Sequence, residues 1–320
     1  MSGPVISRRG FFHNASAAAI AGWGSLALGS GATPARPMRL GGPVFVKSDD
    51  PAELAQAHCE LGYRAAYAPE VDLGDKDRIK AIISEFASRD VAIAEVGAWV
   101  NMLDPDSEKR RKNLEYVTER LALAEDLGAR CCVDIAGSYN PDVWYGPHPE
   151  NFSRRFFEAA VETVRKVIDA VKPHRTAFTV EMMGWCQPSG PDEYVELIKA
   201  VDRKAFAVHL DVCNVINSPE RMYNNAAVIR ECFRKLGRWI VSCHAKDVAW
   251  EVELQVHFKE VVPGRGLVDY PAYLSELAKL PVDAPLMLEH LKTAEEYAEG
   301  RKYIQGVARE LGLSFGDERT

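Results

Sequence analysis

The sequence predicts an α/β fold built as a single (β/α)₈ TIM barrel, and two observations carry this prediction. From Met38 onward, short apolar or β-branched runs alternate with longer segments of helical period, and eight such repeats can be counted. No Gly/Ser-rich linker, charge block or low-complexity stretch divides them. Regular βα alternation is typical of a parallel sheet, and eight units favour closure into a barrel. An open doubly wound sheet is the alternative, but no GxGxxG turn follows the first expected strand.

The expected strands are short apolar runs separated by helical segments. In chain order they cover residues 42–46, 65–68, 91–96, 130–135, 177–181, 206–211, 240–244 and 286–289. The helical period between them is clearest at residues 76–88, 107–127 and 151–171, and the last of these begins with a cap-like Asn-Phe-Ser. We therefore expect one barrel domain over residues 37–314 and a short tail at residues 315–320.

The composition narrows the class of protein. The chain has 320 residues, of which 47% are hydrophobic and 27% are charged, so it can bury a large core. The formal net charge of -7 argues against a nucleic-acid partner, because phosphate binding relies on clustered Lys and Arg. The seven cysteines show no CxxC spacing, which predicts neither a zinc knuckle nor a disulfide framework. The oligomeric state stays open, a homo-oligomer included.

Residues 1–36 read as a leader. Arg8-Arg9 is followed by Gly-Phe-Phe, an Ala-rich apolar run as far as Leu28, and small residues around Ala32 and Ala35. This order resembles a twin-arginine (Tat) export signal, which predicts folding in the cytoplasm, passage through the Tat translocation machinery and a periplasmic or otherwise exported location. A disordered arm is the alternative. A stable membrane anchor is disfavoured because glycines and serines interrupt the run.

Four polar residues stand where the last four expected strands end: Glu181, Asp211, His244 and Glu289. They lie about one βα unit apart, and in a barrel the ends of successive strands surround the same pocket. Three carboxylates and an imidazole gathered there would repel one another unless a divalent cation lay between them. Oxygen-rich ligands with one histidine suit Mn²⁺ first, with Mg²⁺, Co²⁺ or Zn²⁺ as alternatives. The competing interpretation is four unrelated polar strand ends or helix N-caps.

Several segments together resemble one family. They are His209-Leu210-Asp211, His244-Ala245-Lys246-Asp247 and the Pro-Gly-Arg-Gly-Leu-Val-Asp-Tyr of residues 263–270, with Val180-Glu181 and Leu288-Glu289-His290. This ordered set is similar to the xylose-isomerase-like sugar isomerase/epimerase superfamily, whose best-known branch is the D-tagatose 3-epimerase type, and the likeness covers most of the chain after Met38.

The resemblance implies roles for the four residues. Glu181, Asp211, His244 and Glu289 would be the metal ligands, and Glu181 and Glu289 would also be the acid/base pair that moves a proton next to a carbonyl through an enediolate. The epimerase branch carries a substrate-binding His where this chain has Asn214, and an Asn-Arg segment where it has residues 182–187. These departures argue against 3-epimerisation of a free ketohexose. The segment over residues 248–262 also looks like an enlarged loop.

Five residues are candidates for substrate contact. Lys246 follows His244 by two and points to the same side of an extended strand, although a salt bridge with Asp247 is an equal alternative. Trp185 offers a ring for stacking on a sugar, with core packing as the alternative. Asn214, His148 in a loop rich in Tyr, Trp and Pro, and Glu95 near the end of the third strand complete the set, although a structural ion pair is slightly favoured for Glu95. His209 is interpreted as a second-layer core histidine that orients a ligand.

Four functions remain after this reading. The first is a divalent-metal-dependent sugar isomerase or epimerase acting on a keto sugar or keto-glycoside, with a small-molecule carbohydrate as its substrate. The second is a lyase, either a dehydratase or a keto-glycoside-cleaving enzyme, which would use the same metal and base. A metal-dependent endonuclease is disfavoured by the acidic charge and by too few histidines at strand ends. A non-catalytic sugar-binding protein is disfavoured because such proteins usually have two lobes.

Overall fold

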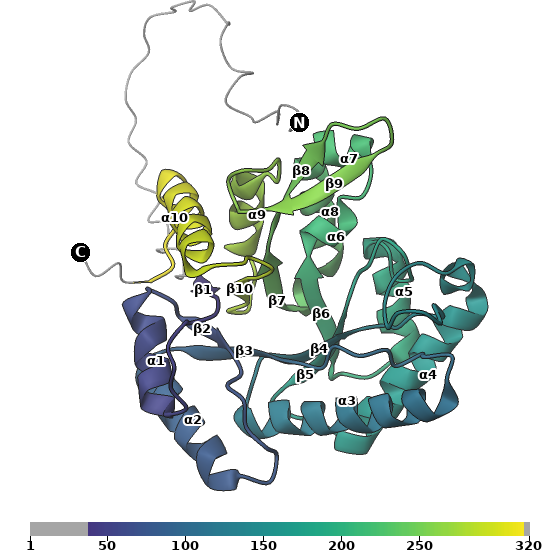
Figure 1. The fold of residues 1–320 in the computed structure, drawn as a ribbon, viewed down its shortest axis with the longest axis horizontal. Helices are drawn as coiled ribbons and strands as arrows, with labels where there is room; N and C mark the ends of the chain where they lie inside the picture. Colours follow the sequence, from purple (N-terminus) through teal and green to yellow (C-terminus); the bar gives the residue numbers. More distant parts are fainter. Residues whose placement is uncertain (1–37, 317–320) are drawn as a thin grey trace, which may run out of the picture.

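The computed structural model describes residues 38–316, and within them the chain forms a closed barrel of eight parallel strands (Figure 1). Around the barrel the strands follow the order β1-β10-β7-β6-β5-β4-β3-β2. The predicted α/β barrel is therefore confirmed. The barrel strands are β1 (Arg39–Gly41), β2 (Ala65–Tyr67), β3 (Ala92–Gly97), β4 (Cys131–Ile135), β5 (Ala177–Glu181), β6 (Phe206–Asp211), β7 (Ile240–Ala245) and β10 (Pro285–Leu288).

Helices connect the strands and cover the outside of the barrel (Figure 1). Two short 3₁₀ turns, Pro149–Phe152 and Gly237–Trp239, precede α4 and β7. The helices are α1 (Pro51–Glu60), α2 (Lys76–Ser88), α3 (Ser107–Leu127), α4 (Arg154–Val171), α5 (Pro191–Val201), α6 (Val212–Val215), α7 (Pro219–Tyr223), α8 (Asn225–Leu236), α9 (Tyr270–Leu277) and α10 (Ala294–Glu310). None of the helices in residues 38–316 is long and apolar enough to cross a membrane.

Capping residues explain why two helices begin and end where the sequence predicts. The carboxylates of Asp75 and Asp106 accept backbone N–H bonds in the first turns of α2 and α3. Helix α3 ends at Gly128, whose φ of 68° is the left-handed conformation that glycine adopts without a steric penalty. Its amide then bonds back to the last turn. Local chemistry alone therefore sets these boundaries.

Two predicted elements differ from the structure. The first strand is Arg39–Gly41, not 42–46, because Leu40 fills the core while Phe45 and Val46 are exposed beyond the strand end. Pro43 also lacks the N–H that a strand inside a sheet needs. The helix expected from residue 151 begins at Arg154, since the hydroxyl of Ser153 caps it and a 3₁₀ turn precedes it.

A two-stranded antiparallel hairpin interrupts the βα pattern between β7 and α9. It is formed by β8 (Asp247–Glu251) and β9 (His257–Val261), and it stands out from the barrel beside α7 and α8 (Figure 1). The ring of Trp250 on β8 stacks on that of Tyr223 at the end of α7, with centroids 5.9 Å apart. The segment that looked like an enlarged loop in the sequence is therefore ordered against the body.

The ends of the described chain lie together, because the amide of Met38 donates to the carbonyl of Ser314 at 2.8 Å. Phe315, in the expected tail, packs against the core and is 6% exposed. The expected leader, residues 1–36, lies outside the described residues, so Tat-dependent export stays a prediction.

Candidate functional site

The register of the barrel brings the four predicted strand-end residues to one mouth. Asp211 on β6 is paired with His244 on β7, and Glu181 is the last residue of β5. Glu289 follows Leu288 of β10, which is paired with Ala245. All four side chains therefore emerge from adjacent strands at the carboxyl end of the barrel, where barrel enzymes hold their active sites.

The four side chains meet around a common centre. The Nδ1 atom of His244 lies 2.7 Å from Oε1 of Glu181 and 2.6 Å from Oε1 of Glu289. One ligand atom from each of the four residues lies within 4.8 Å of the other three. Glu181, Asp211 and His244 are at most 2% exposed, and the side chain of Glu289 is 13% exposed. The structure thus unites the residues that the sequence predicted as a metal site.

Three of the four also keep one polar atom for the centre while the protein holds the other by a hydrogen bond. Glu181 uses Oε2 for the amide of Asn214, Asp211 uses Oδ1 for the backbone N–H of Cys213, and His244 uses Nε2 for Glu95. Four buried ligand atoms make no hydrogen bond with another described residue, although Lys246 forms ion pairs with two of them, Asp211 Oδ2 and Glu289 Oε1. The four are Glu181 Oε1, Asp211 Oδ2, His244 Nδ1 and Glu289 Oε1.

Buried polar atoms nearly always make hydrogen bonds, so four around one point that make none need an explanation. A divalent cation supplies it, because three carboxylate oxygens and one imidazole nitrogen are ligands that Mn²⁺, Mg²⁺, Co²⁺ and Zn²⁺ accept. The residues present therefore fit the predicted ion. The pKa values of Glu181 and Glu289 stay below the usual range, since the neighbouring His244 outweighs the opposing effect of burial.

Lys246 lies beside this centre. Its Nζ atom is 2.8 Å from Oδ2 of Asp211 and 2.6 Å from Oε1 of Glu289, and the residue is only 4% exposed. Burial by itself would lower the pKa of Lys246, but these carboxylates raise it above its usual value. Lys246 is thus a permanent cation at the site, and the salt bridge with Asp247 that the sequence left open is not formed.

Asp247 instead organises the next segment. Its two oxygens accept four backbone N–H groups, from Val248 and Val268 on Oδ1 and from Gly264 and Gly266 on Oδ2, at 2.9 to 3.0 Å. A Cβ at Gly266 would lie 2.2 Å from Oδ1, so only glycine fits there. The Pro-Gly-Arg-Gly-Leu-Val motif is therefore the segment that wraps around the Asp247 carboxylate and donates backbone N–H groups to it.

A layer of paired residues lies directly beneath the centre. Glu95 on β3 is 2% exposed, and its carboxylate contacts His209 Nε2 at 2.8 Å through Oε2 and His244 Nε2 at 3.1 Å through Oε1. The hydroxyl of Ser242 donates to the same Oε2 at 3.3 Å. Burial alone would raise the pKa of Glu95, but His244 and His209 outweigh it and lower the pKa to about 2. Glu95 is therefore ionised.

The other candidate substrate residues are spread along the rim. Asn214 donates to Glu181 and lies at the centre. Trp185 is half-buried, and its carbonyl oxygen accepts from the side chain of Asn151, which is fully buried. His148 accepts a backbone N–H at the start of the 3₁₀ turn before α4. Substrate contact by these residues and by Glu95 stays a prediction.

Two residues near the site were not singled out from the sequence. Glu260 of β9 lies 3.9 Å from Lys246 and is bonded to His290 Nδ1 at 2.9 Å. His290 follows Glu289 directly and has a φ of 58°, an uncommon left-handed conformation for a side-chain-bearing residue. Both border a cavity of about 270 Å³, which Lys246 and Glu289 also line. Its position places the hairpin beside the metal centre.

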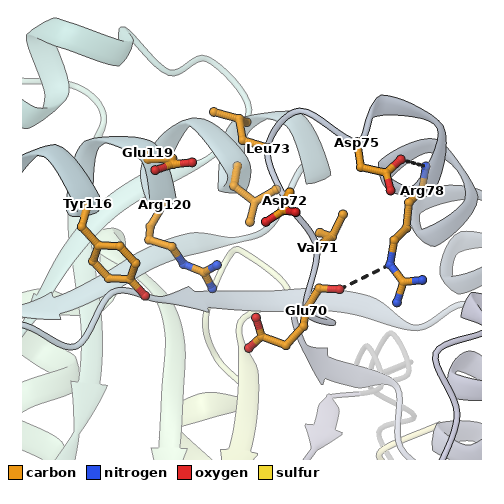
Figure 2. A pocket seen from close by; sticks show the side chains of 10 residues that line it. Glu70, Val71, Asp72, Leu73, Asp75, Arg78, Tyr116, Glu119 and Arg120 are labelled. Atoms are coloured by element: carbon orange, nitrogen blue, oxygen red, sulfur yellow. Dashed lines mark hydrogen bonds between the residues drawn. The ribbon is translucent and has the colours of Figure 1, made fainter.

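A larger hollow, of about 530 Å³, lies elsewhere. It is formed by the β2–α2 segment and one side of α3, as Figure 2 shows, and its lining includes Glu70, Asp72 and Arg120. None of the four strand-end residues borders it. Size therefore does not identify the functional site in this barrel, whereas the buried ligand atoms without hydrogen bonds do.

Comparisons with known proteins agree with this architecture. A model of the family described as "Xylose isomerase-like TIM barrel" matches residues 53–307. No curated protein sequence matches the chain. Similar solved structures are mostly enzymes, and besides the three below they include a dehydratase and an endonuclease IV.

Three of the similar structures illustrate the range. A xylose isomerase-like TIM barrel protein from Mycobacterium smegmatis, in complex with magnesium, has 18% identity and a TM-score of 0.59, with 87% of this chain and 98% of that chain covered. The D-psicose 3-epimerase of Clostridium cellulolyticum has 15% identity and a TM-score of 0.62, with 86% and 100% covered. The 3-keto-D-glucoside 4-epimerase of E. coli has 14% identity and a TM-score of 0.60, with 85% and 99% covered.

At these identities the structures support the fold, and the family match extends over most of the described residues. The chain therefore belongs to the xylose isomerase-like TIM barrel family.

Proposed function

We propose that this chain is a divalent-metal-dependent sugar isomerase or epimerase that moves a proton next to a carbonyl group of a keto sugar or keto-glycoside. The observation that carries the proposal is the convergence of four buried ligand atoms, on Glu181, Asp211, His244 and Glu289, that make no hydrogen bond. Mn²⁺ is the proposed ion, with Mg²⁺, Co²⁺ and Zn²⁺ as alternatives. When bound there, the ion supplies a Lewis acid that stabilises negative charge on a carbonyl oxygen.

The two glutamates are placed for proton transfer. Glu181 ends β5 and Glu289 follows β10, and in the barrel β6 and β7 lie between these strands. The two carboxylates therefore approach the centre from opposite flanks. Both have pKa values below the usual range, so each is a carboxylate at neutral pH and can act as a general base. We propose that one carboxylate removes the proton from one face of the carbon, and that the other first takes up a proton from solvent and delivers it to the opposite face.

The polar surroundings support a carbohydrate as the substrate. Lys246 and Asn214 lie within hydrogen-bond reach of the ligand carboxylates, so they can also hold substrate oxygens that approach the centre. The indole of Trp99 is 38% exposed, and its centroid is 6.4 Å from that of the His244 ring. The cavity beneath the hairpin, next to Glu289, leaves room for the second part of a glycoside.

A lyase is the second candidate, and Lys246 favours it. A buried ammonium beside Glu289 can stabilise the negative charge that develops on a departing oxygen. The same proton removal would then be followed by elimination at the neighbouring carbon. The two functions differ in the mass of the product, since epimerisation conserves it and elimination of a group does not.

The test uses a 3-keto-glucoside in D₂O with Mn²⁺-loaded protein and mass analysis of the products. We expect solvent deuterium to enter the sugar, with otherwise unchanged mass for an epimerase and with loss of the leaving group for a lyase. Glu181→Gln and Glu289→Gln should each lower the rate by about 10²–10⁴-fold. Glu196→Gln, an exposed change on α5, is the matched control and should have no effect.

Failure to find Mn²⁺, Mg²⁺, Co²⁺ or Zn²⁺ bound to the purified protein would contradict the proposal. So would full deuterium exchange in the Glu181→Gln and Glu289→Gln variants, because the proton transfer would then depend on other groups. Action outside the cytoplasm is a separate proposal that rests on the expected leader. It is tested by comparing the cell fractions that contain the full-length protein and an Arg8→Lys, Arg9→Lys variant.

A further inference from the structure

We infer that Glu95 is a positioning residue that presets two of the four metal ligands from below, through its pairing with His209 and His244. The inference rests on the proposed metal site and goes beyond it, because Glu95 itself holds no atom in the ligand set. It also replaces the substrate contact that the sequence suggested for Glu95 with a role one layer deeper in the barrel.

The first step is the direct contact with His244. Glu95 Oε1 lies 3.1 Å from Nε2 of this histidine. Because a carboxylate only accepts hydrogen bonds, Nε2 must carry the proton. The lone pair of the neutral ring then lies on Nδ1, the atom that faces Oε1 of Glu181 and Oε1 of Glu289. A carboxylate behind a metal-binding histidine is a general device for selecting the ring nitrogen that binds.

The second step runs through His209. Its Nε2 is 2.8 Å from the other oxygen of Glu95, and its Nδ1 lies 3.1 Å from Oε1 of Glu181. His209 is fully buried, and its ring packs edge-on against that of His244 with centroids 4.1 Å apart. One carboxylate therefore restrains His244 directly and Glu181 through a single intervening ring.

The third step is the difference between the two layers. The contacts of Glu95 with His209, His244 and Ser242 all have hydrogen-bond geometry. The four upper ligand atoms make no contact of that geometry, and His209 and Lys246 approach them as ion pairs. Hydrogen bonds therefore organise the lower layer without an ion, and the lower layer fixes the upper atoms in advance. A site with its ligands already placed loses less conformational entropy when the ion binds.

The test compares Glu95→Gln with the unsubstituted protein. Glutamine keeps the size of the side chain but places an N–H₂ group against one of the two histidines, so that ring must turn or change its tautomer. We expect Mn²⁺ affinity, measured by calorimetry, to fall by about 10–100-fold. The visible absorption spectrum of the Co²⁺-loaded variant should also change, because the geometry of the bound ion changes.

Asp134→Asn is the matched control. Asp134 is likewise a fully buried acidic side chain on an adjacent strand, β4, although burial raises its pKa well above the usual range. It accepts from the backbone N–H groups of Val100 and Ile135 and contacts neither histidine. Its Mn²⁺ affinity and Co²⁺ spectrum should match those of the unsubstituted protein. If Glu95→Gln lowers thermal stability, comparison with Asp134→Asn at equal stability separates the positioning effect from general damage.

The outcomes separate the two claims. Unchanged Mn²⁺ affinity and an unchanged Co²⁺ spectrum in Glu95→Gln would overturn the inference while leaving the metal site intact. Equal losses in Glu95→Gln and Asp134→Asn would overturn it as well, because any buried carboxylate would then have the same effect. If the unsubstituted protein binds neither ion, the proposed function fails and the inference fails with it.

Discussion

Lys246 and the proposed ion would share two carboxylates, and this sharing has a measurable consequence. The ammonium lies 2.8 Å from Asp211 and 2.6 Å from Glu289, both of which are proposed ligands. We expect Lys246→Met to bind Mn²⁺ at least as tightly as the unsubstituted protein, because a competing positive charge is removed. Its turnover should nevertheless fall by about tenfold or more, since a group that can hold a substrate oxygen is lost.

Calorimetry with Mn²⁺ and steady-state rates on the same preparation test this pair of effects. Lys199→Met on α5 is the control, because this lysine is exposed and does not line the cavity beside Glu289. A variant at position 246 that binds Mn²⁺ more weakly would show that the lysine supports the ion and does not compete with it.

The positions of single site residues were predictable on regular strands and were not predictable on irregular segments. Alternation along β6 and β7 places His209, Asp211, His244 and Lys246 on the inner side, so periodicity alone puts them together. The pairing of Glu95 with two histidines depends on contacts between β3 and strands far along the sequence, which no local pattern encodes. Glu260 reaches the site through a hairpin whose fold the sequence did not reveal.

Among the elements, the hairpin and the segment after it depend on Asp247. We expect Asp247→Asn to lower the free energy of unfolding by about 2–4 kcal/mol, because one of its oxygens becomes an N–H₂ group that faces two buried backbone donors. Denaturant unfolding monitored by circular dichroism measures the change.

Asp72→Asn, an exposed carboxylate in the β2–α2 segment, should have no measurable effect on unfolding and serves as the control. A loss of less than about 0.5 kcal/mol in Asp247→Asn, the range of ordinary surface changes, would mean that the segment 263–268 does not need the wrapped carboxylate.

The element boundaries show what the sequence could define. Helices with an acidic N-cap and a clear period, such as α2 and α3, were predicted to the residue. The first strand was misplaced by three residues because its apolar run continues past the barrel into an exposed loop. The hairpin β8–β9 was expected only as an enlarged loop, since its exposed residues alternate too weakly to predict strands.

For the whole molecule, the acidic centre links stability to metal and to pH. When a chelator keeps the protein free of metal, burial alone would lower the pKa of His244. The carboxylates of Glu289, Glu95 and Glu181 nevertheless raise this pKa well above its ordinary value. The protonated ring thus contributes stability that is complete below the unfolded pKa of about 6.5 and is lost as pH rises through the folded pKa. Ion binding requires the neutral ring, so the stability gained from the ion increases as the pH rises.

We therefore expect EDTA to lower the Tm more at about pH 8.5 than at about pH 6. Free Mn²⁺ at about one hundred times its dissociation constant should contribute about 2.7 kcal/mol to the free energy of unfolding. Differential scanning calorimetry with EDTA and with added Mn²⁺ at both pH values tests this. Asp211→Asn should abolish the response to Mn²⁺, and a chelator effect that is larger at the lower pH would contradict the sign of the linkage.

The pairing of β10 with β1 has a consequence for biosynthesis. The last strand to leave the ribosome closes the cylinder and is followed at once by Glu289, so nascent chains that end before it lack one of the four ligands. The proposed ion therefore has its full set of ligands only after β10 has joined the barrel, and we expect C-terminal degradation products that have lost β10 to retain less of it.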